Sequence, residues 1–163
     1  MRKWTAKKVS KQNVWDWFSI YIRLKYSDEQ GYATCYTCGK KLPLKELQAG
    51  HVIAGRTNAV LFDEELVRPQ CERCNVWHYG EPIAFKDKLV KENGEEWWER
   101  KVAESRKPVK YTQDDLLRLY EKYKKAVDEM ICKIKNPNNL PSRWKDYYER
   151  HCKSATCCSK GVR

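Results

Sequence analysis

The chain has 163 residues, of which 34% are charged, and its formal net charge is +11. This length suits one domain with tails, and no apolar run approaches the roughly 20 residues that a membrane span needs. The first residues lack the apolar stretch of a secretory signal. We therefore expect a cytoplasmic protein with a modest core. In the cytoplasm its thiols should stay reduced.

The positive charge is concentrated at the two ends of the chain. Residues 1–11 carry five basic and no acidic side chains, and residues 132–163 carry eight basic and two acidic ones. Residues 12–131 hold 20 of each sign and are neutral. Basic ends beside a balanced body favour a polyanionic partner, because each neutralised phosphate releases counterions. The alternative is that these ends only aid solubility.

In chain order, the first predicted element is a helix over residues 13–26, with Asn13 as its N-cap. Aromatic residues on this helix could stack on nucleobases, but their helical spacing favours a packed core. The next elements are a turn-rich knuckle, a strand, an irregular loop and a short return strand, over residues 33–42, 47–53, 55–63 and 66–68. We expect the return strand to end at Pro69, which cannot donate a backbone hydrogen bond.

The second half of the chain is predicted to be helical. The chain turns helical from Asn75, and Pro82 suits the first turn of a helix that continues to about residue 91. Two further helices are expected over residues 95–105 and 113–131. Thr112 caps the last one, with Asp115 three residues on. Beyond residue 136 the composition is typical of a linker and a basic tail.

Two Cys-x-x-Cys pairs are the most informative motif of the chain. Their members are Cys35, Cys38, Cys71 and Cys74. Four thiolates in two tight turns supply the tetrahedral ligand set that one structural zinc ion takes. In a cytoplasmic protein this spacing favours zinc over disulfides, which are the alternative for a secreted chain. A zinc ion with four thiolate ligands has no open position for water, so it would serve as a scaffold.

One histidine and one asparagine belong to this cysteine framework. His51 lies between the two pairs, and Asn75 directly follows the last cysteine. A neutral imidazole, with a reference pKa near ~6.5, can take a proton from water, so His51 is a candidate general base. Hydrolysis of a phosphodiester also needs a hard cation at the phosphate. We therefore expect Mg²⁺ or Mn²⁺ in addition to zinc.

The order of these motifs resembles that of the phage NinG (Rap) recombination endonucleases, which are zinc-stabilised HNH, or ββα-metal, nucleases. The motifs are Cys35-x-x-Cys38-Gly39-Lys40, Gln48-Ala49-Gly50-His51, Phe62-Asp63-Glu64-Glu65, Pro69-Gln70-Cys71-x-x-Cys74-Asn75 and the helical stretch Tyr111–Tyr123. The resemblance covers roughly residues 14–131. It implies an α+β fold with a small zinc-stapled ββα-metal core embedded in several helices.

We divide the chain accordingly into three parts. Residues 1–12 form a basic arm, residues 13–131 the nuclease domain with its flanking helices, and residues 132–163 a basic tail that contains cysteines. The resemblance implies metal-dependent cleavage of branched DNA, such as Holliday junctions or D-loops, during phage recombination in the host cytoplasm. His51 matches the general base, and Asn75 matches a ligand of the catalytic Mg²⁺ or Mn²⁺.

The chain departs from the family pattern at three positions. Gly50 stands where many HNH sites have a carboxylate, and Leu66 stands where the family tends to have an asparagine. His78 follows Cys74 by one residue more than the corresponding histidine, and this offset leaves it a candidate metal ligand. The acidic run Asp63-Glu64-Glu65 could supply the missing carboxylate, although such runs are usually a solvated face.

Other assignments are weaker. Arg56 and Arg68 could contact DNA phosphate, although each alone is more often an ordinary surface residue. We expect the remaining cysteines to be free thiols, with a second zinc site as the alternative. They are Cys132, Cys152, Cys157 and Cys158.

Two rival functions come from other classes. One is a zinc-dependent nucleic-acid-binding module without catalysis, which Gly50 and Leu66 make credible. The other is an adaptor that holds phage recombination proteins through the helix at residues 113–131. A homodimer would suit symmetric cleavage of a junction.

Overall fold

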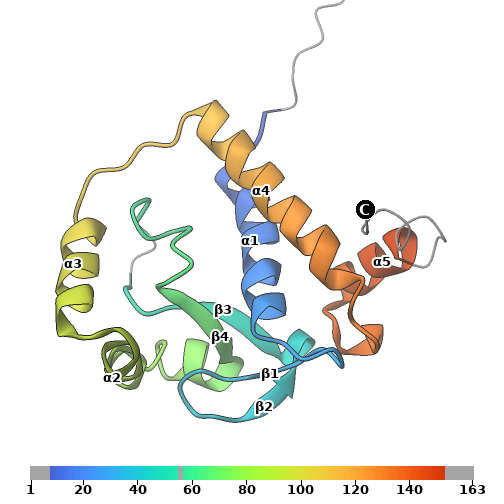
Figure 1. Ribbon diagram of the computed structural model, residues 1–163, viewed down its shortest axis with the longest axis horizontal. Coiled ribbons are helices and arrows are strands. Elements are labelled where there is room, and N and C mark those ends of the chain that lie inside the picture. Colours follow the sequence, from blue (N-terminus) through green and yellow to red (C-terminus); the bar gives the residue numbers. More distant parts are fainter. Residues whose placement is uncertain (1–7, 55–56, 153–163) are drawn as a thin grey trace, which may run out of the picture.

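A computed structural model describes residues 8–54 and 57–152. Within these ranges, five α-helices surround two antiparallel strand pairs (Figure 1). The strands are β1 (Tyr32–Thr34) with β2 (Lys41–Pro43), and β3 (Leu47–His51) with β4 (Val67–Cys71). The helices are α1 (Lys11–Lys25), α2 (Pro82–Asn93), α3 (Glu95–Ser105), α4 (Gln113–Ile131) and α5 (Ser142–His151). Short helical turns are η1 (Leu44–Glu46), η2 (Arg73–Trp77) and η3 (Pro137–Asn139). This mixture confirms the predicted α+β class.

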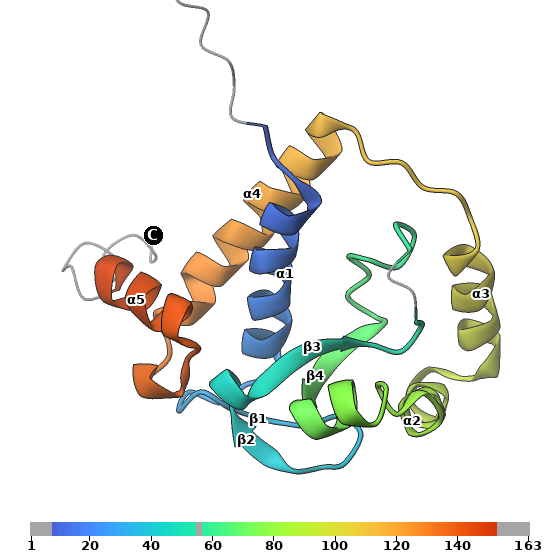
Figure 2. The same ribbon diagram turned by 180° about the vertical axis from the view of Figure 1, so that it is seen from behind.

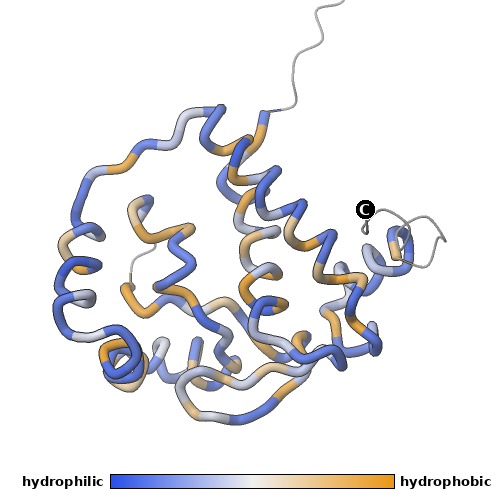
Figure 3. The backbone as a smooth tube through the Cα atoms, in the orientation of Figure 1, coloured by the Kyte–Doolittle hydropathy of each residue, from blue (hydrophilic) through white to orange (hydrophobic). Residues whose placement is uncertain are grey.

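The β3–β4 pair lies between two hydrophobic cores. Alternate residues of a strand face opposite sides, and Leu47 and Ala49 of β3 join the larger core under α1 and α4. Figure 2 shows α1 and α4 on one side of this pair and α2 and α3 on the other. The smaller core there consists of Val52, Val60, Leu66, Phe85, Leu89 and Trp97. Apolar residues recur between polar ones along α1 and α4, as expected for helices that each bury one face (Figure 3).

Helix α1 begins slightly earlier than predicted, and its cap differs. The Ser10 hydroxyl accepts a hydrogen bond from the Asn13 N–H at 3.1 Å, and the Asn13 side chain accepts one from the Ser10 N–H at 2.9 Å. This reciprocal pair is a capping box. The prediction of Asn13 as N-cap was therefore wrong, because its side chain serves the cap from the first turn of the helix.

Strand β4 continues through the proline at which it was predicted to end. Pro69 lies opposite Ala49 in the ladder, and its carbonyl accepts a hydrogen bond from the Tyr36 N–H at 2.8 Å on the outer edge. A proline is tolerated where its missing N–H would point away from the partner strand. The strand therefore extends to Cys71, and this brings the second cysteine pair up to the β1–β2 turn.

The helices of the second half largely confirm the predictions. Helices α3 and α4 have the predicted bounds, Thr112 and Asp115 form the expected cap of α4, and Pro82 begins α2. The helix expected from Asn75 is instead divided in two. The π-helical turn η2 ends at Trp77, and a reversal with positive φ angles at residues 79–81 separates it from α2. No described helix has both the length and the apolar character to cross a membrane.

The segment after α4 is helical where a linker and tail were predicted. Trp144 of α5 is buried and packs edge to face on Trp17 of α1, with ring centroids 5.0 Å apart. Cys132 and Cys152 form a disulfide, so the expectation of free thiols or a second zinc site was wrong for these two. The reason is that α5 folds back and brings their Cα atoms within 5.2 Å. Cys157 and Cys158 lie outside the described residues.

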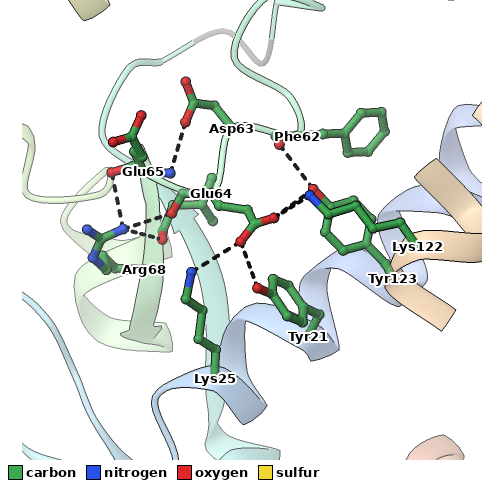
Figure 4. A network of polar contacts seen from close by, with 10 residues as sticks. Tyr21, Lys25, Phe62, Asp63, Glu64, Glu65, Arg68, Lys122 and Tyr123 are labelled. Atoms are coloured by element: carbon green, nitrogen blue, oxygen red, sulfur yellow. Dashed lines mark hydrogen bonds and ion pairs between the residues drawn. The ribbon is translucent and has the colours of Figure 1, made fainter. Parts of the chain in front are cut away.

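One carboxylate ties the loop between β3 and β4 to two helices (Figure 4). Glu64 accepts hydrogen bonds from Tyr21 and Lys25 of α1, at 2.7 and 3.1 Å, and from Lys122 of α4 at 2.7 Å. Burial acts to raise the pKa of Glu64, but the hydrogen bonds from Lys122, Tyr21 and Lys25 outweigh it and lower the pKa to about 2. The loop is therefore anchored by charge as well as by the cores.

Replacing Glu64 with glutamine should destabilise the fold by about 2 kcal/mol at neutral pH, because two lysines lose a partly buried counterion. The pKa of this carboxyl is lower in the folded chain than its usual 4.5. Its contribution should thus be complete above that value and fade as the pH falls toward 2. Urea unfolding at neutral pH and near pH 3 measures this, and the gap between wild type and variant should shrink in acid.

The matched control for this experiment is Glu29→Gln, because Glu29 forms an ion pair with Lys135 in which both side chains are well exposed. Exposed pairs contribute about 0–1 kcal/mol. Equal losses of stability in the two variants would contradict the anchoring role of Glu64.

Candidate metal centre and catalytic residues

Four thiols meet where the β1–β2 turn approaches the end of β4. The sulfur atoms of Cys35, Cys38, Cys71 and Cys74 all lie within 4.8 Å of one another, and those of Cys38 and Cys71 are 3.9 Å apart. Three of the four residues are buried, and Cys38 is exposed. The predicted ligands therefore converge, and the cluster could hold a zinc ion.

Hydrogen bonds favour the thiolate form of one member of the cluster. The Cys71 N–H donates to Cys35 Sγ at 3.3 Å, and the Thr37 hydroxyl lies 3.5 Å from the same sulfur. Burial acts to raise the pKa of Cys35, but the hydrogen bonds from Thr37 and from backbone N–H groups lower it to about 6. Burial raises the pKa of Cys74 to about 12. A divalent cation among the sulfurs would favour the thiolate form of all four.

His51 is the last residue of β3, and its ring lies on the α1 side of the strand pair. The ring stacks on Trp15 of α1, with centroids 5.2 Å apart and planes at 18°. Its Nε2 lies 3.2 Å from the carbonyl oxygen of Leu61. A carbonyl oxygen can only accept, so this contact requires the proton on Nε2 and places the lone pair of the neutral ring on Nδ1. In this form the imidazole can act as a base.

Amide side chains gather on the opposite face of β3. Asn75 of η2 donates from Nδ2 to Gln48 Oε1 at 2.6 Å. A Cβ atom added to Gly50 would lie 1.9 Å from Gln70 Oε1 and 3.0 Å from Asn75 Oδ1. A side chain at position 50 would therefore have to displace the Gln70 amide, which gives a physical reason for glycine at this position. His51 directly follows Gly50, so both candidate residues lie at the same end of β3.

Gln70 belongs to this group, and sequence reasoning missed it. Its side chain is fully buried, and Nε2 donates to the Gly80 carbonyl at 2.8 Å and to Thr37 Oγ1 at 3.2 Å. The Gly80 carbonyl accepts only, so the orientation of the amide is determined. Oε1 is buried and has no hydrogen-bond partner among the described residues. The signal available in the sequence was a glutamine directly before a metal-ligand cysteine.

The carboxylates that might have replaced one at position 50 are paired with lysines. Besides the Glu64 network, Lys101 of α3 forms ion pairs with Asp63, at 2.9 Å, and with Glu65. Lys101 is itself buried. Asp63 and Glu64 are thus half-buried anchors for the loop, whereas Glu65 is exposed although it also pairs with Lys101. Leu66, where the family tends to have asparagine, is buried in the smaller core.

His78 has protein partners at both ring nitrogens. Nδ1 donates to Glu81 Oε1 at 2.6 Å, and Arg73 Nε lies 3.5 Å from Nε2. Its assignment as a ligand of the catalytic metal stays a prediction.

The two arginines assigned to DNA differ in what can be said of them. Arg68 is almost wholly buried, and its Nη1 donates to the carbonyls of Glu64, Glu65 and Val67 at 3.0–3.1 Å. It also lines a pocket with Lys88 and Lys91. Arg56 lies outside the described residues. Phosphate contact stays a prediction for both.

Comparison with known families places the chain in a phage protein family. A family model described as "Bacteriophage Lambda NinG protein" matches residues 1–132. The matched region contains the four-cysteine cluster, His51, Gln70 and Asn75. Curated proteins and solved structures gave no significant match.

We expect the purified protein to hold one zinc ion at the cysteine cluster, with an apparent binding free energy on the order of 10–16 kcal/mol. A chelator should unfold the region 33–80, because the ion would join the β1–β2 turn to the end of β4. Metal analysis and circular dichroism, with and without chelator, measure this. Cys38→Ser should lose the zinc, while the matched variant Cys132→Ser should retain it. A wild-type protein that is folded without zinc would disprove the role of zinc as a structural scaffold.

Gly50→Ala should destabilise the fold, because the added methyl group meets Oε1 of Gln70. Two hydrogen bonds donated by Nε2 hold this amide in place. Overpacking of this kind costs about 1–3 kcal/mol. The cost should fall in a Gln70→Ala background, which gives a coupling of at least about 1 kcal/mol in a double-mutant cycle from urea unfolding. The control is Gly94→Ala, whose Cβ would meet no neighbour within 4 Å. Its effect should add to that of Gln70→Ala, and similar additivity for Gly50→Ala would disprove the contact.

Proposed function

Because the chain belongs to the NinG family of bacteriophage lambda, we propose that it is a metal-dependent endonuclease that cleaves branched DNA in phage recombination. Family membership supports the recombination context. The order of β3, loop, β4 and η2 around the cysteine cluster is the arrangement that we propose as an HNH-like ββα-metal core. The family match includes every residue to which this proposal gives a catalytic role.

The form in which His51 is held is the observation that carries this proposal. With Nε2 donating to the Leu61 carbonyl, we propose that Nδ1 accepts a proton from the water molecule that attacks phosphorus. Stacking on Trp15 limits rotation of the ring. Leu61 belongs to the same loop as Glu64, so the ion pairs of Glu64 also hold the carbonyl that orients the histidine.

Asn75 is the residue that we propose as a ligand for Mg²⁺ or Mn²⁺. Its hydrogen bond to Gln48 orients the amide, and the hard oxygen Oδ1 is the kind of donor that these ions take. A bound ion would stabilise the negative charge that develops on the phosphate and on the leaving oxygen. Asn75 directly follows Cys74, so the cysteine cluster limits where this amide can lie.

The basic ends of the chain suit DNA as the partner. Their positive side chains can neutralise backbone phosphates whatever the base sequence is. We propose that the protein acts in the host cytoplasm, where the branched DNA of recombination forms. A homodimer would place two sites on the two strands of a symmetric junction.

The packing over Gly50 favours a second candidate function. Gln70 occupies the space of a side chain at this position, so the carboxylate of many HNH sites is missing here. A chain that lacks this ligand could retain the zinc scaffold and bind nucleic acid without cutting it, or serve as an adaptor for recombination proteins. Cleavage assays separate these functions.

His51→Ala should slow cleavage of a four-way junction in Mg²⁺ by about 10²–10⁴-fold, which is the usual effect of removing a general base. Single-turnover kinetics measure the rate, and gel shift and metal analysis should show unchanged junction binding and zinc content. The matched control is His151→Ala on α5, an exposed histidine. If His51→Ala cuts at the wild-type rate, the base lies elsewhere. If the wild type binds junctions but never cuts them, the protein is a nucleic-acid-binding module without catalysis.

Asn75→Ala should give a different phenotype, because it removes an oxygen ligand and leaves the base in place. We expect a higher Mg²⁺ concentration for half-maximal rate and partial rescue by excess Mn²⁺. A metal titration of the cleavage rate, run beside His51→Ala, measures this. The assignment fails if the metal dependence of Asn75→Ala equals that of the wild type.

A further inference from the structure

We propose that Gln70 supplies an amide oxygen to a divalent cation that it shares with Asn75, next to Gly50. The use of this cation in cleavage rests on the function proposed above. Binding of the cation does not, and it can be tested alone.

The first argument is the unsatisfied oxygen of Gln70. The side chain is fully buried, and Oε1 has no hydrogen-bond partner among the described residues. A buried polar atom left in this state costs about 1–3 kcal/mol. The amide cannot turn to relieve this cost, because Nε2 donates to the Gly80 carbonyl and to Thr37. A cation beside Oε1 would give the oxygen its missing partner.

The second argument is that a second amide oxygen lies at the same place. Gln70 Oε1 and Asn75 Oδ1 both lie within 3.0 Å of the point that a Cβ atom on Gly50 would occupy. Each amide has its nitrogen engaged elsewhere, Gln70 with Gly80 and Thr37 and Asn75 with Gln48. Both nitrogens are therefore engaged elsewhere, and both oxygens lie beside Gly50. Hard oxygen donors of this kind suit Mg²⁺ and Mn²⁺.

The third argument concerns the residue before His51. Many HNH sites resembling this one have a carboxylate there, and here the position is a glycine whose side-chain space is taken by Gln70. The oxygen of Gln70 thus lies, from the neighbouring strand, where a side chain on residue 50 would begin. Strand pairing explains how, because Gln70 lies directly opposite Gln48 and its side chain extends along the face toward Gly50.

The charge of this site has a consequence for affinity. Two amide oxygens are neutral, so they attract a divalent cation less than carboxylates do, and such ions commonly complete their coordination with substrate phosphate. We therefore expect weak Mn²⁺ binding by the protein alone and tighter binding in the presence of DNA. A purely structural role for Gln70 would explain the two hydrogen bonds of Nε2. It would also predict that replacing Gln70 does not change the affinity for Mn²⁺.

The first test uses zinc-loaded wild-type protein and Mn²⁺, whose unpaired electrons broaden nearby NMR signals. The side-chain amide signal of Gln70 should broaden at low Mn²⁺ concentrations together with that of Asn75. The matched glutamine is Gln12 in the first turn of α1, which is exposed and should keep its signal. If Mn²⁺ leaves the signals of Gln70 and Asn75 sharp, or broadens that of Gln12 equally, the proposal is wrong.

The second test measures Mn²⁺ affinity from the electron paramagnetic resonance of the free ion. Gln70→Ala and Asn75→Ala should each weaken binding at least tenfold, while Gln12→Ala should not change it. Retained zinc and circular dichroism show whether Gln70→Ala is folded, and the NMR test on wild type decides if it is not. Wild-type affinity in a folded Gln70→Ala variant would overturn the proposal. Mn²⁺ binding without junction cleavage would overturn only the nuclease function.

Discussion

The convergence of four thiols between the β1–β2 turn and the end of β4 is the constraint on which the rest of the structure depends. It joins parts of the chain that are 33 residues apart at Cys38 and Cys71. Because Cys71 ends β4 and Cys74 lies within η2, the cluster determines the direction in which the chain leaves the strand. Asn75 is the next residue, so its amide meets Gln48 on β3. One candidate catalytic residue, Asn75, is thus positioned by the cysteine framework.

Features that depend on neighbouring residues were predictable from the sequence. The bounds of α3 and α4 follow from helical periodicity, and Thr112 and Pro82 mark helix starts through interactions within one turn. The convergence of the cysteines was predictable for a similar reason, because two residues between ligands form a tight turn. His51 and Asn75 were proposed as catalytic residues from their positions in this framework, and this stays a prediction.

Features that depend on distant residues were not predictable. Glu64 belongs to a run that resembles a solvated face, but its partner Lys122 lies 58 residues further on. Cys132 and Cys152 lack metal-ligand spacing, and only the packing of α5 against α1 brings them together. Gln70 is ordinary in sequence, since its importance comes from the missing side chain of Gly50 on the neighbouring strand. Two residues that are 20 positions apart in the chain define that contact only once β3 and β4 are paired.

The packing of Gln70 over Gly50 restricts how this protein can evolve. A relative could carry a carboxylate at position 50 only if the Gln70 amide moved away or the residue at position 70 were smaller, and we expect each change alone to give a less stable protein. Selection should therefore preserve the pair as a unit, and the two positions should covary among relatives. In such an alignment, glycine at position 50 would accompany glutamine at position 70, while an acidic residue at position 50 would accompany a short side chain.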